Sequence, residues 1–173
     1  ETGEINWQDL IKGNIYFDPN NLSDPVLIRE DGTLLYHLPS VIDDIQEKIT
    51  HIIRGEDHIV NTAYHIQIFK ALDSTEPKFA HHPFLIDDQG KGFSKRMGSL
   101  SISSFKDQGF ENIVLLNYFL FIGSSSNIVP MKDLKELINK FDINNISKSS
   151  AKFSKETLLS LNQNTIKLFS FDE

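Results

Sequence analysis

The most concentrated anion-binding chemistry in the chain lies in the segment Gly90–Gly98, which reads Gly-Lys-Gly-Phe-Ser-Lys-Arg-Met-Gly. Glycine lets the backbone approach a ligand closely, and successive backbone N–H groups can bind an anion. Lys95 and Arg96 can neutralise phosphate charge as it develops in a transition state. A basic, glycine-containing loop is also an ordinary solvated turn, and composition alone favours that second interpretation.

A second candidate is Arg54, which ends the apolar segment Thr50–Arg54. A guanidinium group at the end of a strand can hold a carboxylate through two parallel hydrogen bonds. The alternative, which the residues alone favour slightly, is a structural salt bridge to a nearby carboxylate: Asp43, Asp44 or Asp57.

The histidines and carboxylates do not have the spacing of a metal site. The chain has six histidines and no cysteine, so a disulfide and a cysteine-ligated zinc site are excluded. His81 and His82 are adjacent, and in a strand they point to opposite faces. Asp43 and Asp44 are adjacent on an expected short helix and share no face, which disfavours a two-carboxylate hydrolase. We therefore expect no metal site.

The elements that must position these residues form a strand–helix–strand unit. The hydrophobic pattern predicts strands over 50–54 and 79–86 with a helix over 57–72 between them. Such a succession gives a parallel pair of strands, and ligands bind at the carboxyl ends of parallel strands. Arg54 and the loop after Ile86 fall at those ends. The expected fold class is therefore α/β.

Upstream of this unit, the segments Pro25–Glu30 and Thr33–Leu38 flank an Asp-Gly pair and predict a β-hairpin. The following proline stops the second strand, and Ser40 is a plausible N-cap of a helix over 41–48. Tyr36 lies near the end of that strand, where a tyrosine more often packs in a core than contacts a ligand. Residues 1–24 are polar and contain at most one short strand, so we expect them to be the tail of another unit.

Downstream of residue 98 the pattern becomes helical. Four helices are expected, over 101–108, 110–122, 131–140 and 155–168. Gly109 and Gly123 are placed as C-terminal caps, and Pro130 lies just before a helix start. The chain therefore divides into residues 1–24, an α/β part over 25–98 and a helical part over 99–173.

Composition limits the class of protein further. The chain has 173 residues and a formal net charge of −7, so no overall basic surface indicates nucleic-acid binding, and any RNA contact must come from local patches. The longest apolar run, Ile113–Ile122, is too short to span a bilayer. We expect a cytoplasmic protein without a membrane anchor. The first residue is glutamate, and the simplest explanation is that the true N-terminus is missing.

Four segments in this order resemble the bacterial glutamyl-tRNA synthetases, a family of class I aminoacyl-tRNA synthetases. They read DGTLLYHLPSVIDD, ITHIIRGEDHIVNTAYH, PKFAHHPFLIDDQGKGFSKRMGSLSISSF and LLNYFLFIG. The resemblance runs from about Gly13 to Ile166 and is strongest to alphaproteobacterial sequences. It implies the C-terminal half of a class I synthetase Rossmann fold, followed by an all-helical segment that contacts the tRNA stem. Residues 1–24 would be the end of the acceptor-binding insertion.

The resemblance implies that the protein activates glutamate with ATP and Mg²⁺ and transfers it to the 3′ end of tRNA(Glu), with tRNA(Gln) as an open second substrate. The family's Lys-Leu-Ser-Lys-Arg loop, which binds ATP, matches Gly92, Phe93, Ser94, Lys95 and Arg96. Lys95 would be the catalytic contact to the ATP phosphates. Gly92 departs from the family's usual lysine, which removes one positive charge from the loop.

The resemblance also implies a glutamate pocket. Arg54 would bind the side-chain carboxylate, Tyr36 would line the pocket, and Ser40 stands where some members carry an asparagine that faces the amino acid. Asp57 and His58 would lie near ATP, close to the adenosine or the terminal tRNA nucleotide.

The family's His-Ile-Gly-His signature does not occur in the chain, and neither does the anticodon-binding domain. We therefore expect a piece of a monomeric ligase that is inactive alone. Two alternatives remain. One is the related enzyme that glutamylates queuosine in tRNA, which the long helical continuation disfavours. The other is a non-catalytic nucleotide- or RNA-binding module.

Overall fold

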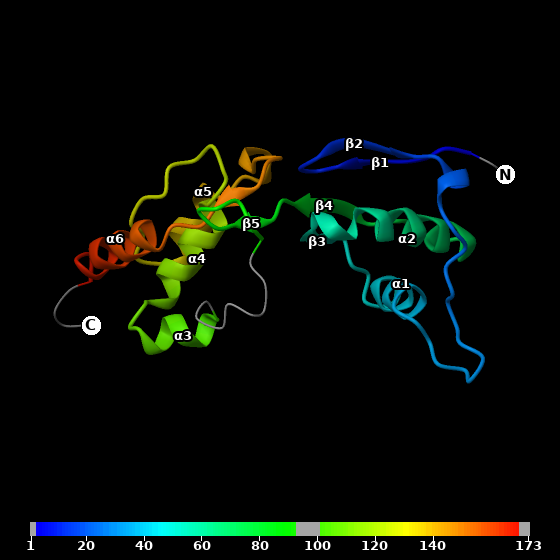
Figure 1. Cartoon of the computed structure of the whole chain (residues 1–173), viewed down its shortest axis with the longest axis horizontal. Helices are drawn as coiled ribbons and strands as arrows, with labels where there is room; N and C mark the ends of the chain where they lie inside the picture. The colour runs from blue at the N-terminus through cyan, green and yellow to red at the C-terminus, as the bar shows by residue number, and fades with distance from the viewer. Residues whose placement is uncertain (1–2, 93–100, 170–173) are drawn as a thin grey trace. The chain divides into compact units, whose positions relative to one another are not determined.

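The computed structural model describes residues 3–92 and 101–169 of the chain. The chain forms two compact units, Glu1–His82 and Pro83–Glu173, each with its own core (Figure 1). We call them the first unit and the second unit.

The first unit begins with an antiparallel hairpin of β1, Ile5–Asp9, and β2, Gly13–Phe17. Inward and outward side chains alternate along β1, so Ile5 and Trp7 are buried. The backbone N–H of Leu10 donates to the carbonyl oxygen of Phe79, which ties the hairpin to the rest of the unit. Residues 1–24 were expected to be the tail of another unit; here Ile5 and Trp7 contribute to the core of the first unit.

The centre of the unit confirms the expected strand–helix–strand arrangement. Strand β3, His51–Gly55, pairs in parallel with β4, Lys78–His82. They are joined by the short 3₁₀ helix η2, Glu56–His58, and by α2, Ile59–Ala71. In the register of the pair, Arg54 lies opposite His81. The two strands therefore bring side chains distant in sequence to the same end of the sheet.

The expected hairpin before this unit is only partly formed. A single antiparallel bridge joins Ile28 to Leu34, and Gly32 has a positive φ of 82° in the turn between them. The predicted second strand is wrong from His37 onward, because helix α1 spans His37–Gln46. Pro39 does not end a strand but lies in the first turn of this helix, where its missing N–H costs no intrahelical hydrogen bond.

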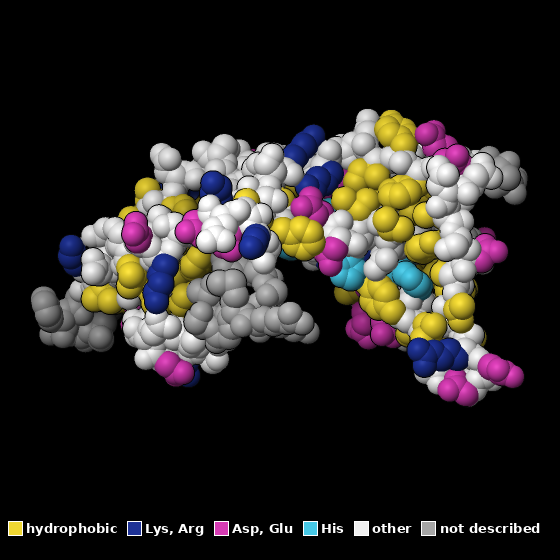
Figure 2. All heavy atoms as spheres, viewed as in Figure 1, with side chains coloured by type: hydrophobic (Ala, Val, Ile, Leu, Met, Phe, Trp, Pro, Cys, Tyr) yellow, Lys and Arg dark blue, Asp and Glu magenta, His cyan; other side chains and the backbone are white. Residues whose placement is uncertain are grey.

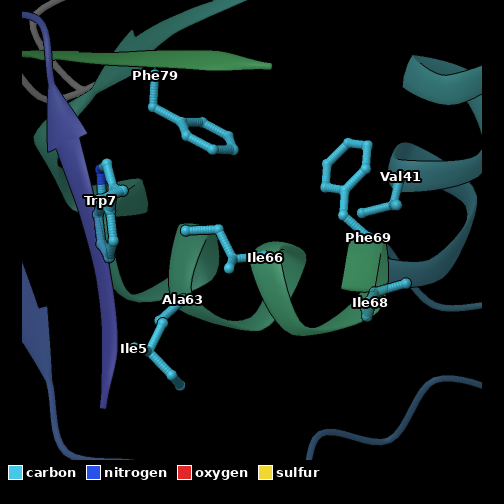
Figure 3. Packing of buried hydrophobic residues seen from close by; sticks show 8 residues of the cluster. All are labelled: Ile5, Trp7, Val41, Ala63, Ile66, Ile68, Phe69 and Phe79. Atoms are coloured by element: carbon cyan, nitrogen blue, oxygen red, sulfur yellow. The ribbon is translucent and has the colours of Figure 1, made fainter. Parts of the chain in front are cut away.

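The core of the first unit is built around α2 (Figure 3). Ala63, Ile66 and Phe69 of this helix point into the same apolar space as side chains from the neighbouring elements. The hairpin and the strands contribute Ile5, Trp7 and Phe79, and α1 contributes Val41. The indole ring of Trp7 stacks on Phe17 with ring centroids 5.8 Å apart and meets Phe79 edge-on at 6.4 Å.

The second unit confirms the expected helices and adds a short strand pair. The single strand expected over 79–86 is broken at Pro83, and its end is β5, Leu85–Ile86. This strand pairs in parallel with β6, Ala151–Lys152, a strand that the helical pattern did not predict. The helices are α3, Ile102–Asp107; α4, Asn112–Phe121; α5, Leu134–Lys140; and α6, Lys155–Ile166.

Glycine and short polar side chains set the ends of these helices. Gly109 and Gly123 follow α3 and α4 with φ of 79° and 74°, the left-handed conformation that glycine adopts at a helix end. Ser101, Asp133 and Ser154 are N-caps whose side chains accept a backbone N–H from the first turn. No helix within residues 3–92 and 101–169 is long and apolar enough to cross a membrane.

Candidate functional site

Arg54 lies near the carboxyl end of β3, and two hydrogen bonds fix its guanidinium group. Its Nη1 donates to the hydroxyl of Tyr36 at 2.9 Å, and its Nη2 donates to Oγ1 of Thr62 at 2.6 Å. Tyr36 immediately precedes α1, and Thr62 lies near the start of α2. The strand therefore carries the cation, and the two helices determine where it points.

The structural salt bridge weighed as an alternative for Arg54 is not formed. Within the described residues, no carboxylate lies at ion-pair distance from its guanidinium group. Burial lowers the pKa of Arg54, although the nearby charges of Asp44 and Asp57 act in the opposite direction. Its Nε is buried and has no hydrogen-bond partner there. The second hydrogens of Nη1 and Nη2 also have no partner in the described part of the chain, and such donors can bind a carboxylate.

Aromatic rings surround this cation. The ring of Tyr36 lies 5.3 Å from His37, 5.4 Å from His65 and 6.0 Å from His58, measured between centroids. Figure 2 shows histidine side chains on the face of the first unit, among hydrophobic ones and near acidic ones. The structure therefore brings together three of the predicted residues, Tyr36, Arg54 and His58, and adds His37 and His65.

The two added histidines are neutral at physiological pH. His65 is buried, and burial, together with the charge of Arg54, lowers its pKa to about 3. Burial and Arg54 also lower the pKa of His37. Both ring nitrogens of His65 and Nδ1 of His37 lack a partner within the described part of the chain. Arg54 is thus a cation beside neutral rings that retain hydrogen-bonding capacity.

Ser40, Asp57 and His58 lie around this centre. The backbone N–H of Ser40 donates to the carbonyl of Tyr36 at 3.2 Å, so Ser40 lies one helical turn further along α1. Asp57 and His58 belong to η2, and Nε2 of His58 lies 3.7 Å from a carboxylate oxygen of Asp57. The other ring nitrogen of His58 bonds to Asn61 at 3.0 Å.

The basic loop is described only at its start. Gly92 forms an antiparallel bridge with Ile86, and a carboxylate oxygen of Asp87 accepts the N–H groups of Gln89 and Lys91 at 2.9 and 2.7 Å. These residues belong to the second unit. The other candidates in the loop lie outside the described residues: Phe93, Ser94, Lys95 and Arg96.

Behind Arg54 lies a buried polar chain that the sequence did not reveal. Oδ2 of Asp9 lies 2.5 Å from Nδ1 of His81, and Nε2 of His81 lies 2.9 Å from Oγ1 of Thr62. All three side chains are buried. The register that places Arg54 opposite His81 was one usable signal, because parallel pairing of the two strands was expected. The contribution of Asp9 had no such signal.

Within residues 3–92 and 101–169, no three histidine or acidic side chains are grouped so that they could hold a metal ion. The cluster around Arg54 is suited to hydrogen bonding with an anion and an aromatic or polar ligand.

Comparisons with known proteins identify the family of the chain. Residues 1–160 match the family described as tRNA synthetases class I (E and Q), catalytic domain. The chain is 47% identical to glutamate–tRNA ligase 2 of Beijerinckia indica, covering 99% of the chain and 39% of the relative. It is 45% identical to glutamate–tRNA ligase 1 of Brucella ovis, covering 98% and 37%. The chain thus spans about two fifths of the length of these relatives.

Solved structures give the same result. The crystal structure of a glutamate tRNA ligase from Elizabethkingia meningosepticum, in complex with its amino acid, superposes with a TM-score of 0.85 at 31% identity, over 98% of this chain and 38% of that one. The glutamate–tRNA synthetase of Elizabethkingia anophelis gives a TM-score of 0.83 at 30% identity, with the same coverage. The chain belongs to the catalytic-domain family of the class I tRNA synthetases for glutamate and glutamine.

Proposed function

We propose that this chain supplies the glutamate-binding part of a glutamate–tRNA ligase. The observation that carries the proposal is Arg54, a partly buried guanidinium group held by Tyr36 and Thr62 and without a carboxylate partner in the described chain. The ligase would join the α-carboxylate of glutamate to the α-phosphate of ATP as glutamyl-adenylate with release of pyrophosphate, and would then transfer the glutamyl group to the 3′ end of tRNA(Glu) with release of AMP.

Arg54 would bind the side-chain carboxylate of glutamate. A guanidinium group has only donors and an ionised carboxylate only acceptors, so all of their hydrogen bonds can be formed together. The amide of glutamine presents its own N–H₂ donors to the same guanidinium and leaves groups unpaired. Unpaired polar groups in a buried site give strong discrimination between substrates. Tyr36 and Ser40 would line the rest of the pocket from α1.

The remaining site residues are assigned on the family resemblance. Lys95 would contact the ATP phosphates within the loop of Gly92, Phe93, Ser94 and Arg96, with Mg²⁺ entering together with ATP. Asp57 and His58 would lie near the adenosine or the terminal nucleotide of the tRNA. We further propose a monomeric, cytoplasmic enzyme. Aminoacylation assays with purified tRNA(Glu) and tRNA(Gln) would establish which of the two it charges.

The test uses a full-length ligase in which these 173 residues replace the matching segment of the Brucella ovis enzyme. Arg54→Ala should lower kcat/KM for glutamate by at least about thirtyfold. The reason is that removing one partner of a buried charge pair costs about 2–5 kcal/mol. The KM for ATP should change much less. Arg29, an exposed arginine of the same unit, provides the control variant Arg29→Ala.

Glutamate-dependent exchange of pyrophosphate into ATP measures both substrates. Unchanged kinetic constants for glutamate in Arg54→Ala would contradict the proposal. The 173-residue chain alone should show no exchange above a mock preparation, because positioning ATP and glutamate together supplies several kcal/mol of the rate acceleration and the chain spans only 39% of its relative. Exchange by the isolated chain would overturn that expectation.

A further inference from the structure

We infer that Asp9, His81 and Thr62 are positioning residues that set the orientation of Arg54 for its carboxylate ligand. The inference rests on the proposed function of Arg54 as the glutamate-binding group and extends it to side chains that do not contact the substrate. We call the hydrogen-bonded series Asp9–His81–Thr62 the relay.

Asp9 anchors the relay. Its Oδ1 accepts the backbone N–H groups of Ile11 at 3.0 Å, Lys12 at 2.8 Å and His81 at 3.2 Å, and its Oδ2 faces Nδ1 of His81 at 2.5 Å. Burial raises the pKa of Asp9, but the hydrogen bonds from His81, Lys12 and Ile11 outweigh burial and lower the pKa to about 2. The carboxylate is therefore ionised, and the proton shared with His81 lies on Nδ1.

The ring of His81, held by Asp9, in turn fixes the hydroxyl of Thr62 through a hydrogen bond. In the tautomer that carries its proton on Nδ1, toward Asp9, Nε2 of His81 is the acceptor for the Thr62 hydroxyl 2.9 Å away. The hydroxyl oxygen then directs its lone pairs toward Nη2 of Arg54, which donates to it at 2.6 Å. The carbonyl oxygen of His58 lies 3.2 Å from the same hydroxyl and competes with Nε2 of His81 for its single hydrogen.

The relay is rigid because its members come from separate packed elements. Asp9 ends β1, His81 lies on β4, and Thr62 lies on α2, and His81 and Thr62 are 0% exposed. Tyr36 holds Nη1 of Arg54 while Thr62 holds Nη2, so two fixed points determine the plane of the guanidinium group. The second hydrogens of Nη1 and Nη2 have no partner in the described part of the chain and are left for a carboxylate. Misplacement of such a group weakens recognition even when its charge is kept.

The experiment compares Thr62→Val, which keeps the shape of the side chain but removes the hydroxyl, with Thr62→Ser, which keeps the hydroxyl. In the full-length ligase that carries these residues, Thr62→Val should raise the KM for glutamate roughly tenfold or more, as expected for losing a buried hydrogen bond to a charged group. The KM for ATP should change less than about threefold, and Thr62→Ser should restore most of the affinity. Equal effects on both substrates, or no rescue by serine, would overturn the inference.

A second measurement reports on the relay without glutamate. In the 173-residue chain itself, nuclear magnetic resonance of the Arg54 side chain measures rotation of the guanidinium group. We expect slow rotation in the parent chain and in Thr62→Ser, and fast rotation in Thr62→Val and His81→Phe. If guanidinium rotation in Thr62→Val is as slow as in the parent chain, the inference that the relay orients Arg54 is overturned. Failure of the glutamate proposal would instead appear as unchanged glutamate kinetics in Arg54→Ala, with the rotation result intact.

Discussion

The two units of the chain bury polar groups in different ways. In the first unit, Asp9, His81 and Thr62 are joined in series and lead to Arg54. In the second unit, the hydroxyl of Tyr118 donates to the carbonyl of Ser154 at 3.1 Å and accepts its N–H at 2.7 Å, which ties α4 to the start of α6. The first arrangement leads to a group that can bind a ligand, whereas the second only joins two helices.

The unpartnered buried atoms show the same contrast. Among the described residues of the first unit, the buried atoms without partners are Nε1 of Trp7, Nε of Arg54, Nδ1 of His37 and both ring nitrogens of His65. Those of Arg54, His37 and His65 belong to side chains that adjoin one another. In the second unit, the corresponding atoms are Oδ1 of Asn117 and Oγ1 of Thr165, on different helices. The unpartnered atoms of Arg54, His37 and His65 are therefore clustered, whereas those of the second unit are not.

The largest expected effect is on the anchor of the relay. Asp9→Ala should lower the free energy of unfolding of the first unit by about 3–5 kcal/mol, because the change leaves several buried donors without their charged acceptor. Trp7 is the single tryptophan and lies in the core of this unit, so its fluorescence during chemical denaturation measures this unit alone. Asp31→Ala, at an exposed carboxylate, is the control. An Asp9→Ala curve that matches the control would show that Asp9 is not an anchor.

The second unit should be most sensitive at Gly123. This glycine has a φ of 74°, and a Cβ there would lie 2.6 Å from Cβ of Ala151. Gly123→Ala should cost roughly 2–4 kcal/mol from backbone strain and overpacking together. Gly109→Ala has the same backbone problem at a φ of 79° but meets open space, so it should cost less. Circular dichroism follows the helices, while Trp7 fluorescence should remain unchanged in both variants. Equal costs would mean that the contact with Ala151 is relieved without strain.

Acid should destabilise the first unit selectively. The pKa of Asp9 falls from 3.8 in the unfolded chain to about 2 in the folded one, so its stabilisation is complete above pH 3.8 and is lost as the pH falls toward 2. The loss amounts to roughly 2 kcal/mol for a difference of this size. Denaturation followed by Trp7 fluorescence between pH 5 and pH 2 measures it. Asp9→Asn should flatten this dependence, and an equally steep curve in that variant would assign the acid sensitivity to other groups.

A smaller effect on stability is expected at Tyr118, whose hydrogen bonds join helices and do not lead to Arg54. Tyr118→Phe removes the two hydrogen bonds to Ser154 and should destabilise the second unit by about 1–2 kcal/mol. Because these bonds lead to no ligand, the KM for glutamate in the full-length ligase should remain unchanged. A raised KM would show that the contrast between the two units is false.

The sequence predicted the elements better than the tertiary contacts. Hydrophobic periodicity predicted β3, α2 and the helices of the second unit, because each has a repeated apolar pattern within one segment. It failed for β1, where the inward positions Ile5, Trp7 and Asp9 end on a carboxylate that breaks the apolar pattern. It also failed at the start of α1, because Pro39 suggests the end of a strand as readily as the first turn of a helix.

The candidate site shows the same difference between what local sequence predicts and what depends on tertiary contacts. The resemblance implied that Arg54 and Tyr36 share a pocket, whereas the residues alone favoured a salt bridge for Arg54 and core packing for Tyr36; the structure places the two side chains in hydrogen-bond contact. The relay was not predictable, since its members are separated by many residues and meet only when β1 packs beside β4. Hydrogen bonds between such distant side chains depend on tertiary packing that no local pattern encodes. The roles of Lys95 and its loop remain predictions.

The central claim, that Arg54 recognises the side-chain carboxylate of glutamate, is tested most directly by amino-acid preference. In the full-length ligase, the ratio of kcat/KM for glutamate to that for glutamine in pyrophosphate exchange should fall by at least about thirtyfold in Arg54→Ala, because only the charged substrate loses its partner. The ratio in Arg29→Ala should equal that of the parent enzyme. A preference for glutamate that survives unchanged in Arg54→Ala would contradict the account.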